Sequence, residues 1–111
     1  MIGSHYMDKI YNCREVSEID IFDNTASKMR IDWDYKNERI LVRTEKGWTF
    51  LDSDLTVGQV IKNIGYDSHF IQVIWSRADK LTNVLDTSVK NSSLSIIRIY
   101  KKNLKHYLDF L

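Results

Sequence analysis

A short helix-forming segment follows directly after strand-like runs, and this order constrains the fold more than any other feature of the chain. The segment LTVGQVIKNIG, residues 55–65, carries an apolar stripe at helical spacing. The stripe consists of Val57, Val60, Ile61 and Ile64. Thr56 and Gln59 have the spacing of a capping box, and Gly65 stands where a left-handed C-cap is expected. Because so short a helix is unstable alone in water, we expect it to pack on a sheet.

Strand-like runs flank this helix on both sides. The expected strands are residues 29–35, 39–44, 48–52, 70–76 and 94–100. The first of them, MRIDWDY, alternates apolar and polar side chains, as a half-buried strand does. The run FIQVIWS is apolar on both faces and is expected in the interior of the sheet. The predicted fold class is therefore α+β, with a mixed β-sheet and one helix packed across it.

Both ends of the chain extend this core. The tail KKNLKHYLDFL, residues 101–111, has apolar side chains at helical spacing, which predicts a C-terminal helix. The irregular segment DNTAS predicts a boundary between an N-terminal extension, residues 1–27, and a single α+β domain, residues 28–111. The opening MIGSHYM contains a string common in expression tags, so no inference about the fold is based on residues 1–7.

Composition limits the class of protein. The 111 residues are enough for one domain, and 43% hydrophobic residues are typical of a globular chain. The net charge of +1 gives no global field that would attract nucleic acid. The only cysteine, Cys13, has no partner for an intrachain disulfide, and no apolar run is long enough to span a membrane. A cytoplasmic location is expected, and a small, single-domain chain without proline suggests a phage or mobile-element accessory protein.

From residue 39 onward the pattern resembles the ubiquitin-like β-grasp superfamily. RILVRTEKGWTFLDSD is similar to the opening hairpin of that family, and LTVGQVIKNI is similar to its single helix. VIWSRADKL is similar to the third strand with its following turn, and LDTSVKNSSLSIIRIY to the closing segment. The resemblance covers residues 39–100 and implies a β-grasp core, to which MRIDWDY adds an extra N-terminal strand.

The end of the chain departs from that family. Ubiquitin and the sulfur carriers of the same fold end in two glycines, whereas this chain continues through KKNLKHYLDFL. Conjugation or sulfur transfer through a C-terminal glycine is therefore not expected. The resemblance implies instead a non-enzymatic protein-binding module, an adaptor or an inhibitor.

The resemblance also implies a recognition surface. Ile74 aligns with the core-facing member of the third strand, so Trp75 is expected on the outer face, with Ser95 and Ile97 of the last strand beside it. An exposed tryptophan is a strong anchor for a partner protein, and Arg43 is a candidate charge at the rim. The alternative is that another segment covers Trp75 and makes it part of the core. We also consider a homodimer formed by pairing MRIDWDY with its own copy.

A second function is nucleic-acid binding. Basic side chains gather in the last strand and the tail, close to two tyrosines. The candidate residues are Arg98, Lys101, Lys102 and Lys105. Phosphate contacts would make binding steeply dependent on salt, whereas an apolar protein interface would not. The simpler interpretation is a docked helix with its charged face in water.

Catalytic and metal-binding patterns are weak. Asp32 and Asp34 could serve acid–base chemistry in a small enzyme, but alternation alone produces this spacing, and a solvated strand face is the simpler interpretation. Cys13 is expected to be an idle thiol. The histidines are His5, His69 and His106, and none stands at zinc-ligand spacing from another ligand. We therefore predict no enzyme activity, no cofactor and no metal.

Overall fold

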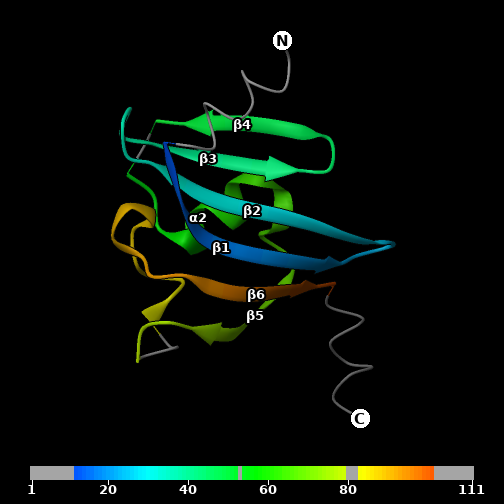
Figure 1. Ribbon diagram of the computed structural model, residues 1–111. Helices are drawn as coiled ribbons and strands as arrows, with labels where there is room; N and C mark the ends of the chain where they lie inside the picture. The colour runs from blue at the N-terminus through cyan, green and yellow to red at the C-terminus, as the bar shows by residue number, and fades with distance from the viewer. Residues whose placement is uncertain (1–11, 53, 80–82, 102–111) are drawn as a thin grey trace.

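The computed structural model describes residues 12–52, 54–79 and 83–101, which form an α+β fold of six strands and one short helix (Figure 1). The predicted fold class is therefore confirmed, while the predicted C-terminal helix lies outside the described residues. The elements in chain order are β1 (Cys13–Phe22), β2 (Ala26–Asp34), β3 (Arg39–Thr44), β4 (Gly47–Leu51), α2 (Val57–Ile61), η1 (Lys62–Tyr66), β5 (Phe70–Ser76), η3 (Val89–Asn91) and β6 (Ser95–Tyr100).

The strands form one mixed sheet in the order β4-β3-β2-β1-β6-β5. Strands β1 and β6 run parallel at its centre, and every other neighbouring pair is antiparallel. Figure 1 shows α2 crossing one side of this sheet. The hairpin of β3 and β4, which the family resemblance assigned as the opening hairpin, is separated from β6 by the two strands β2 and β1.

Strand β1 is the main departure from the sequence-based prediction. Residues 1–27 were expected to lie outside the core, yet β1 pairs with β2 on one side and β6 on the other. The register shifts between Glu15 and Ser17, so the neighbours Val16 and Ser17 are both buried. This bulge breaks the alternation by which a half-buried strand is recognised in sequence. The predicted boundary is therefore wrong for residues 13–27, which belong to the single domain.

Two further predictions about strand position are wrong. Strand β5 was expected in the interior, but it pairs only with β6 among the described strands and lies at an edge of the sheet. Strand β2 was considered as a dimer edge, but it lies between β1 and β3, so both of its sides are already paired. Burial between two neighbouring strands therefore does not explain the apolar side chains of β5.

The core lies between the sheet and α2. The helix contributes Val57, Val60 and Ile61, which are fully buried and confirm the predicted apolar stripe. Ile64 is half-buried and packs against the same cluster. The sheet contributes alternate residues, among them Ile19, Met29, Ile31, Ile40, Val42, Ile97 and Ile99. Their side chains define the inner face of the sheet, and the opposite face is called the outer face below.

The loop after β5 completes the start of α2. The predicted capping box is confirmed: Thr56 Oγ1 accepts from the Gln59 N–H at 3.1 Å, and Gln59 Oε1 accepts from the Thr56 N–H at 2.9 Å. The Val57 N–H donates to Thr87 O at 3.1 Å, and the Gly58 N–H donates to Leu85 O at 2.9 Å. The free N–H groups of the first turn are thus bonded partly by a segment about thirty residues further along the chain. A buried helix end requires such hydrogen-bond partners.

Glycine is required at two positions of this helical region. A Cβ atom at Gly58 would lie 2.9 Å from Leu85 O, closer than the two atoms can approach. Gly65 has φ +116°, a conformation that favours glycine, and it ends the helical region as predicted. Gly58 weakens the intrinsic helix propensity, but it allows the loop backbone to lie directly against α2.

Candidate functional site

The exposed apolar side chains of β5 are the strongest candidate for a contact surface. Ile74 is 37% exposed and Trp75 is 43% exposed, although they are consecutive residues of one strand. The cause is a bulge: Val73 pairs with Ile97, and the next paired residue, Trp75, pairs with Ile96. The extra residue lets neighbouring side chains both reach solvent. The expected exposure of Trp75 is confirmed, whereas the expected core position of Ile74 is wrong.

The same bulge explains why two predicted neighbours of Trp75 are wrong. Ile97 and Ser95 are fully buried, and Ser95 Oγ lies 2.9 Å from Ser17 Oγ. Without the bulge, the Val73–Ile97 register would continue to a Trp75–Ser95 pair. The shift of one residue places the half-buried Ile96 opposite Trp75 instead. Ile74 and Ile96 are thus the apolar residues near Trp75 that sequence reasoning missed, and two adjacent large apolar residues in one strand were the available signal.

Trp75 stands at one end of a row that crosses the outer face. Residues paired directly across strands share a face of the sheet. The pairings form a continuous row of Trp75, Ile96, Glu18, Arg30, Arg43 and Trp48. Trp48 on the opposite edge strand, β4, is also 43% exposed and lies edge-on to Phe50 at 5.4 Å between ring centroids. The outer face therefore has an exposed tryptophan at each edge and charges between them.

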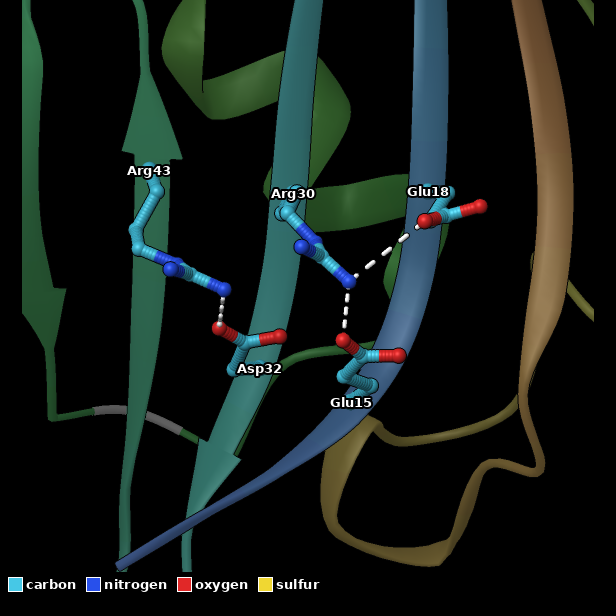
Figure 2. Close-up of polar contacts among 5 residues, drawn as sticks. All are labelled: Glu15, Glu18, Arg30, Asp32 and Arg43. Carbon is cyan, nitrogen blue, oxygen red and sulfur yellow. Dashed lines mark hydrogen bonds and ion pairs between the residues drawn. The ribbon is translucent and has the colours of Figure 1, made fainter. Parts of the chain in front are cut away.

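The charges between the tryptophans are paired with one another. Figure 2 shows Arg30 of β2 reaching Glu15 and Glu18 of β1, with 3.4 Å between Arg30 Nη2 and Glu18 Oε1. It also shows Arg43 of β3 bound to Asp32, with 2.9 Å between Arg43 Nη2 and Asp32 Oδ2. The Arg43 side chain is only 15% exposed. Arg43 therefore holds Asp32 in place, and the prediction of an open rim charge is wrong.

Asp32 and Asp34 are not a solvated pair, as their spacing had suggested. They are 2% and 3% exposed. Burial raises the pKa of Asp32, and the attraction of Arg43 offsets this effect only in part. Burial also acts to raise the pKa of Asp34, but hydrogen bonds from Asn37 and Arg39 outweigh it and hold this pKa below its ordinary value.

The two carboxylates have different structural roles. Asp34 accepts the Asn37 N–H at 3.1 Å, Asn37 Nδ2 at 3.0 Å and Arg39 Nε at 3.1 Å, which fixes the turn between β2 and β3. Asp32 Oδ1 has no hydrogen-bond partner among the described residues. Burial, together with the nearby charges of Asp34 and Asp32, raises the pKa of Cys13 to about 11, so its thiol is protonated at neutral pH and is a poor nucleophile.

The basic residues of the second hypothesis are only partly brought together. Arg98 is exposed on the outer face, directly across from Asp20. Lys101 Nζ lies 3.1 Å from Asp23 Oδ1 and 2.8 Å from Asn24 Oδ1. Lys102 and Lys105 lie outside the described residues. An engaged Lys101 has less charge to offer a phosphate backbone than the sequence suggested.

The histidines give no cluster of ligands in the part of the chain that the structure describes. His69 lies beside Asp23, with 3.5 Å between Nε2 and Oδ2, and packs edge-on against Tyr66. His5 and His106 are outside the described ranges. No group of three or more metal-ligating side chains occurs within residues 12–52, 54–79 and 83–101.

Comparison of the chain with protein-family models, with curated proteins and with solved structures gave no match. Among the described residues, no helix has the length and apolar character needed to cross a membrane.

Proposed function

We propose that this protein is a non-enzymatic protein-binding module, an adaptor or an inhibitor, that holds its partner at the edge strand β5. Trp75 is the anchor, and Ile74 and Ile96 extend the apolar contact. The single observation that supports the proposal most is the exposure of Ile74 and Trp75 side by side on an edge strand. A bulge that turns two large apolar side chains toward water has no benefit for the core of the protein.

Physical considerations favour this edge over the rest of the surface. Tryptophan is among the residues that contribute most to protein interfaces when a partner covers them. An edge strand also offers backbone N–H and C=O groups to an extended segment of a partner, which can add a strand to the sheet. In contrast, Glu15, Glu18 and Arg30 at the centre of the outer face already form ion pairs with one another.

The β-grasp resemblance remains a proposal as well. It is supported by a mixed sheet with one capped helix. The strand that pairs in parallel with β6 is β1, which lies outside residues 39–100 on which the resemblance rests. A protein-binding role follows from that resemblance as a prediction, and the single cysteine predicts a cytoplasmic setting.

The test is affinity capture from a lysate of the native host with three versions of the protein. Trp75→Ala is compared with wild type and with Trp48→Ala, which removes an equally exposed tryptophan from the opposite edge of the same face. Circular dichroism first establishes that each variant is folded. We expect wild type and Trp48→Ala to retain a protein that Trp75→Ala loses, with affinity reduced by at least about thirtyfold.

Other outcomes would contradict the proposal for β5 or identify another kind of partner. Equal capture by all three proteins would contradict the proposal for β5. Loss with Trp48→Ala alone would move the contact to β4. A retained species that is nucleic acid, released steeply by salt and weakened by Arg98→Gln, would favour the nucleic-acid hypothesis. A dimer of the protein itself that dissociates with Trp75→Ala would identify the partner as a second copy.

A further inference from the structure

A second surface feature, separate from the exposed edge residues, is a hollow at one end of the sheet. Its volume is about 510 Å³, within the roughly 300–1,000 Å³ range of small-molecule sites. Three segments meet there: the start of β1, the residue after β5, and the stretch from η3 to the start of β6. Its charged lining consists of Arg14, Arg77, Lys90 and Glu15, and we call it the basic pocket.

The positive charges of the basic pocket are not neutralised within the described part of the chain. Neither Arg14, Arg77 nor Lys90 forms an ion pair with a carboxylate there. The one acidic residue of the lining, Glu15, is bound to Arg30 on the outer face (Figure 2). The lining therefore has three cationic side chains, and its one carboxylate, that of Glu15, is already paired with Arg30.

Arg14 is fixed in position by backbone groups. Its Nη1 donates to Ser92 O at 2.5 Å, and its Nη2 donates to Lys90 O at 2.9 Å and Val89 O at 3.3 Å. These bonds tie the loop that carries Lys90 to the central strand β1. A cation held in this way loses little conformational freedom when a ligand arrives.

Neutral donors are also available at the pocket. The side chains of Asn91 and Ser93 line it and form no hydrogen bond with any described residue. The hydroxyl of Ser92 is different, because it already donates toward Ser88 O at 2.9 Å. A ligand with several acceptor oxygens would thus find two cationic side chains free to move, one fixed guanidinium and two uncharged donors.

We infer that the basic pocket binds a small phosphate-bearing molecule. A phosphate group has the charge and the multiple acceptor oxygens that a guanidinium fork and an ammonium group recognise together. The adjoining hollow, about 370 Å³, shares Asn91, Ser92 and Ser93 with the basic pocket but contains Asp79, whose charge repels a second anionic group. The phosphate end of the ligand therefore lies on the side of Arg77 and Lys90, and a neutral part can extend toward Asp79.

The experiment is a titration of the full chain with inorganic phosphate and with pyrophosphate, followed by amide chemical shifts in NMR at constant ionic strength. We expect saturable shifts for residues 77 and 90–94. Arg77→Gln and Lys90→Gln should each weaken pyrophosphate binding about tenfold, because each removes one charge-assisted hydrogen bond. Both side chains are exposed, so neither variant should disturb folding.

Arg98→Gln is the matched control, because it removes an exposed cation from the outer face and not from the pocket. It should leave the affinity unchanged. The inference is overturned if shifts fail to saturate, if sodium chloride at the same ionic strength produces the same shifts, or if Arg98→Gln weakens binding as much as Arg77→Gln. Because Trp75 does not line the pocket, Trp75→Ala should bind pyrophosphate normally even if the proposed protein-binding function fails.

Discussion

At the scale of single residues, Asp32 and Arg43 form a buried ion pair on the outer face of the sheet. Asp32 is 2% exposed, and burial raises its pKa, which means that its charged form is destabilised in the folded protein. The positive charge of Arg43, whose Nη2 lies 2.9 Å from Asp32 Oδ2, offsets part of the cost of burying the carboxylate. Removing one partner of a buried pair leaves an uncompensated charge, and that is more costly than losing an exposed pair.

We therefore predict that Arg43→Met lowers the free energy of unfolding by about 3 kcal/mol at about pH 7. The matched change Arg30→Met, which breaks exposed pairs with Glu15 and Glu18, should cost less than about 1 kcal/mol. Urea denaturation measures both. Equal losses in the two variants would show that burial of Asp32 does not decide the effect.

The pH dependence of Arg43→Met follows from the same shift. A carboxyl group whose pKa is raised in the folded state adds stability once it is protonated, and this contribution is lost as the pH rises through the raised pKa. Without Arg43 the Asp32 pKa rises further. The deficit of Arg43→Met relative to wild type should therefore shrink between about pH 7 and about pH 4. Parallel denaturation series at the two pH values provide the measurement, and a deficit independent of pH would contradict the mechanism.

Gly58 gives a second prediction at this scale. Helix propensity alone predicts that Gly58→Ala stabilises α2 by about 1 kcal/mol. The added Cβ would, however, lie 2.9 Å from Leu85 O, a backbone atom that cannot turn away. We expect the clash to prevail and the variant to be less stable by about 1–3 kcal/mol in urea denaturation. A more stable variant would show that the loop moves away freely.

At the scale of elements, α2 forms because local and distant groups both satisfy its first turn. Thr56 and Gln59 form the capping box, and the loop carbonyls of Leu85 and Thr87 accept the N–H groups that the box leaves. Thr56→Ala should lower the free energy of unfolding by about 1 kcal/mol. Thr49→Ala on the exposed edge strand is the control and should change it by less than about 0.5 kcal/mol. Thermal unfolding followed by circular dichroism compares the two, and an equal effect would argue against the cap.

The two β-bulges explain which strand positions and faces were predicted wrongly from the sequence. The capped helix and the regular strands β3 and β6 were predicted nearly to the residue, because their patterns are local. In β1 the bulge after Glu15 buries two neighbours, and in β5 the bulge after Val73 exposes two neighbours. Each bulge removes the period of two on which strand and face prediction rests. The bulge in β5 is the reason why Ile97, and not Ile96, was predicted to lie beside Trp75.

At the scale of the whole molecule, β1 joins the two halves of the sheet. It pairs antiparallel with β2 and parallel with β6, and among the described strands no other pairing links strands β2–β4 to β5 and β6. A chain that begins at residue 28, the domain start expected from sequence, should therefore be unfolded. Loss of amide dispersion in NMR would establish this, and addition of a peptide of residues 12–27 should restore it. A dispersed spectrum without the peptide would contradict the central role of β1.

The sequence by itself determined the α+β class, the approximate positions of strands β2 to β6, and the cap and apolar stripe of α2. These features depend on spacing within a few residues, and local spacing is what a sequence displays. Only the tertiary structure decided that β1 is central, that β5 is an edge, that Arg43 is bound to Asp32, and that Arg14, Arg77 and Lys90 meet at one pocket. The reason is physical: strand pairing and charge pairing join residues up to about eighty positions apart, and their partners are chosen by the packing of the whole chain.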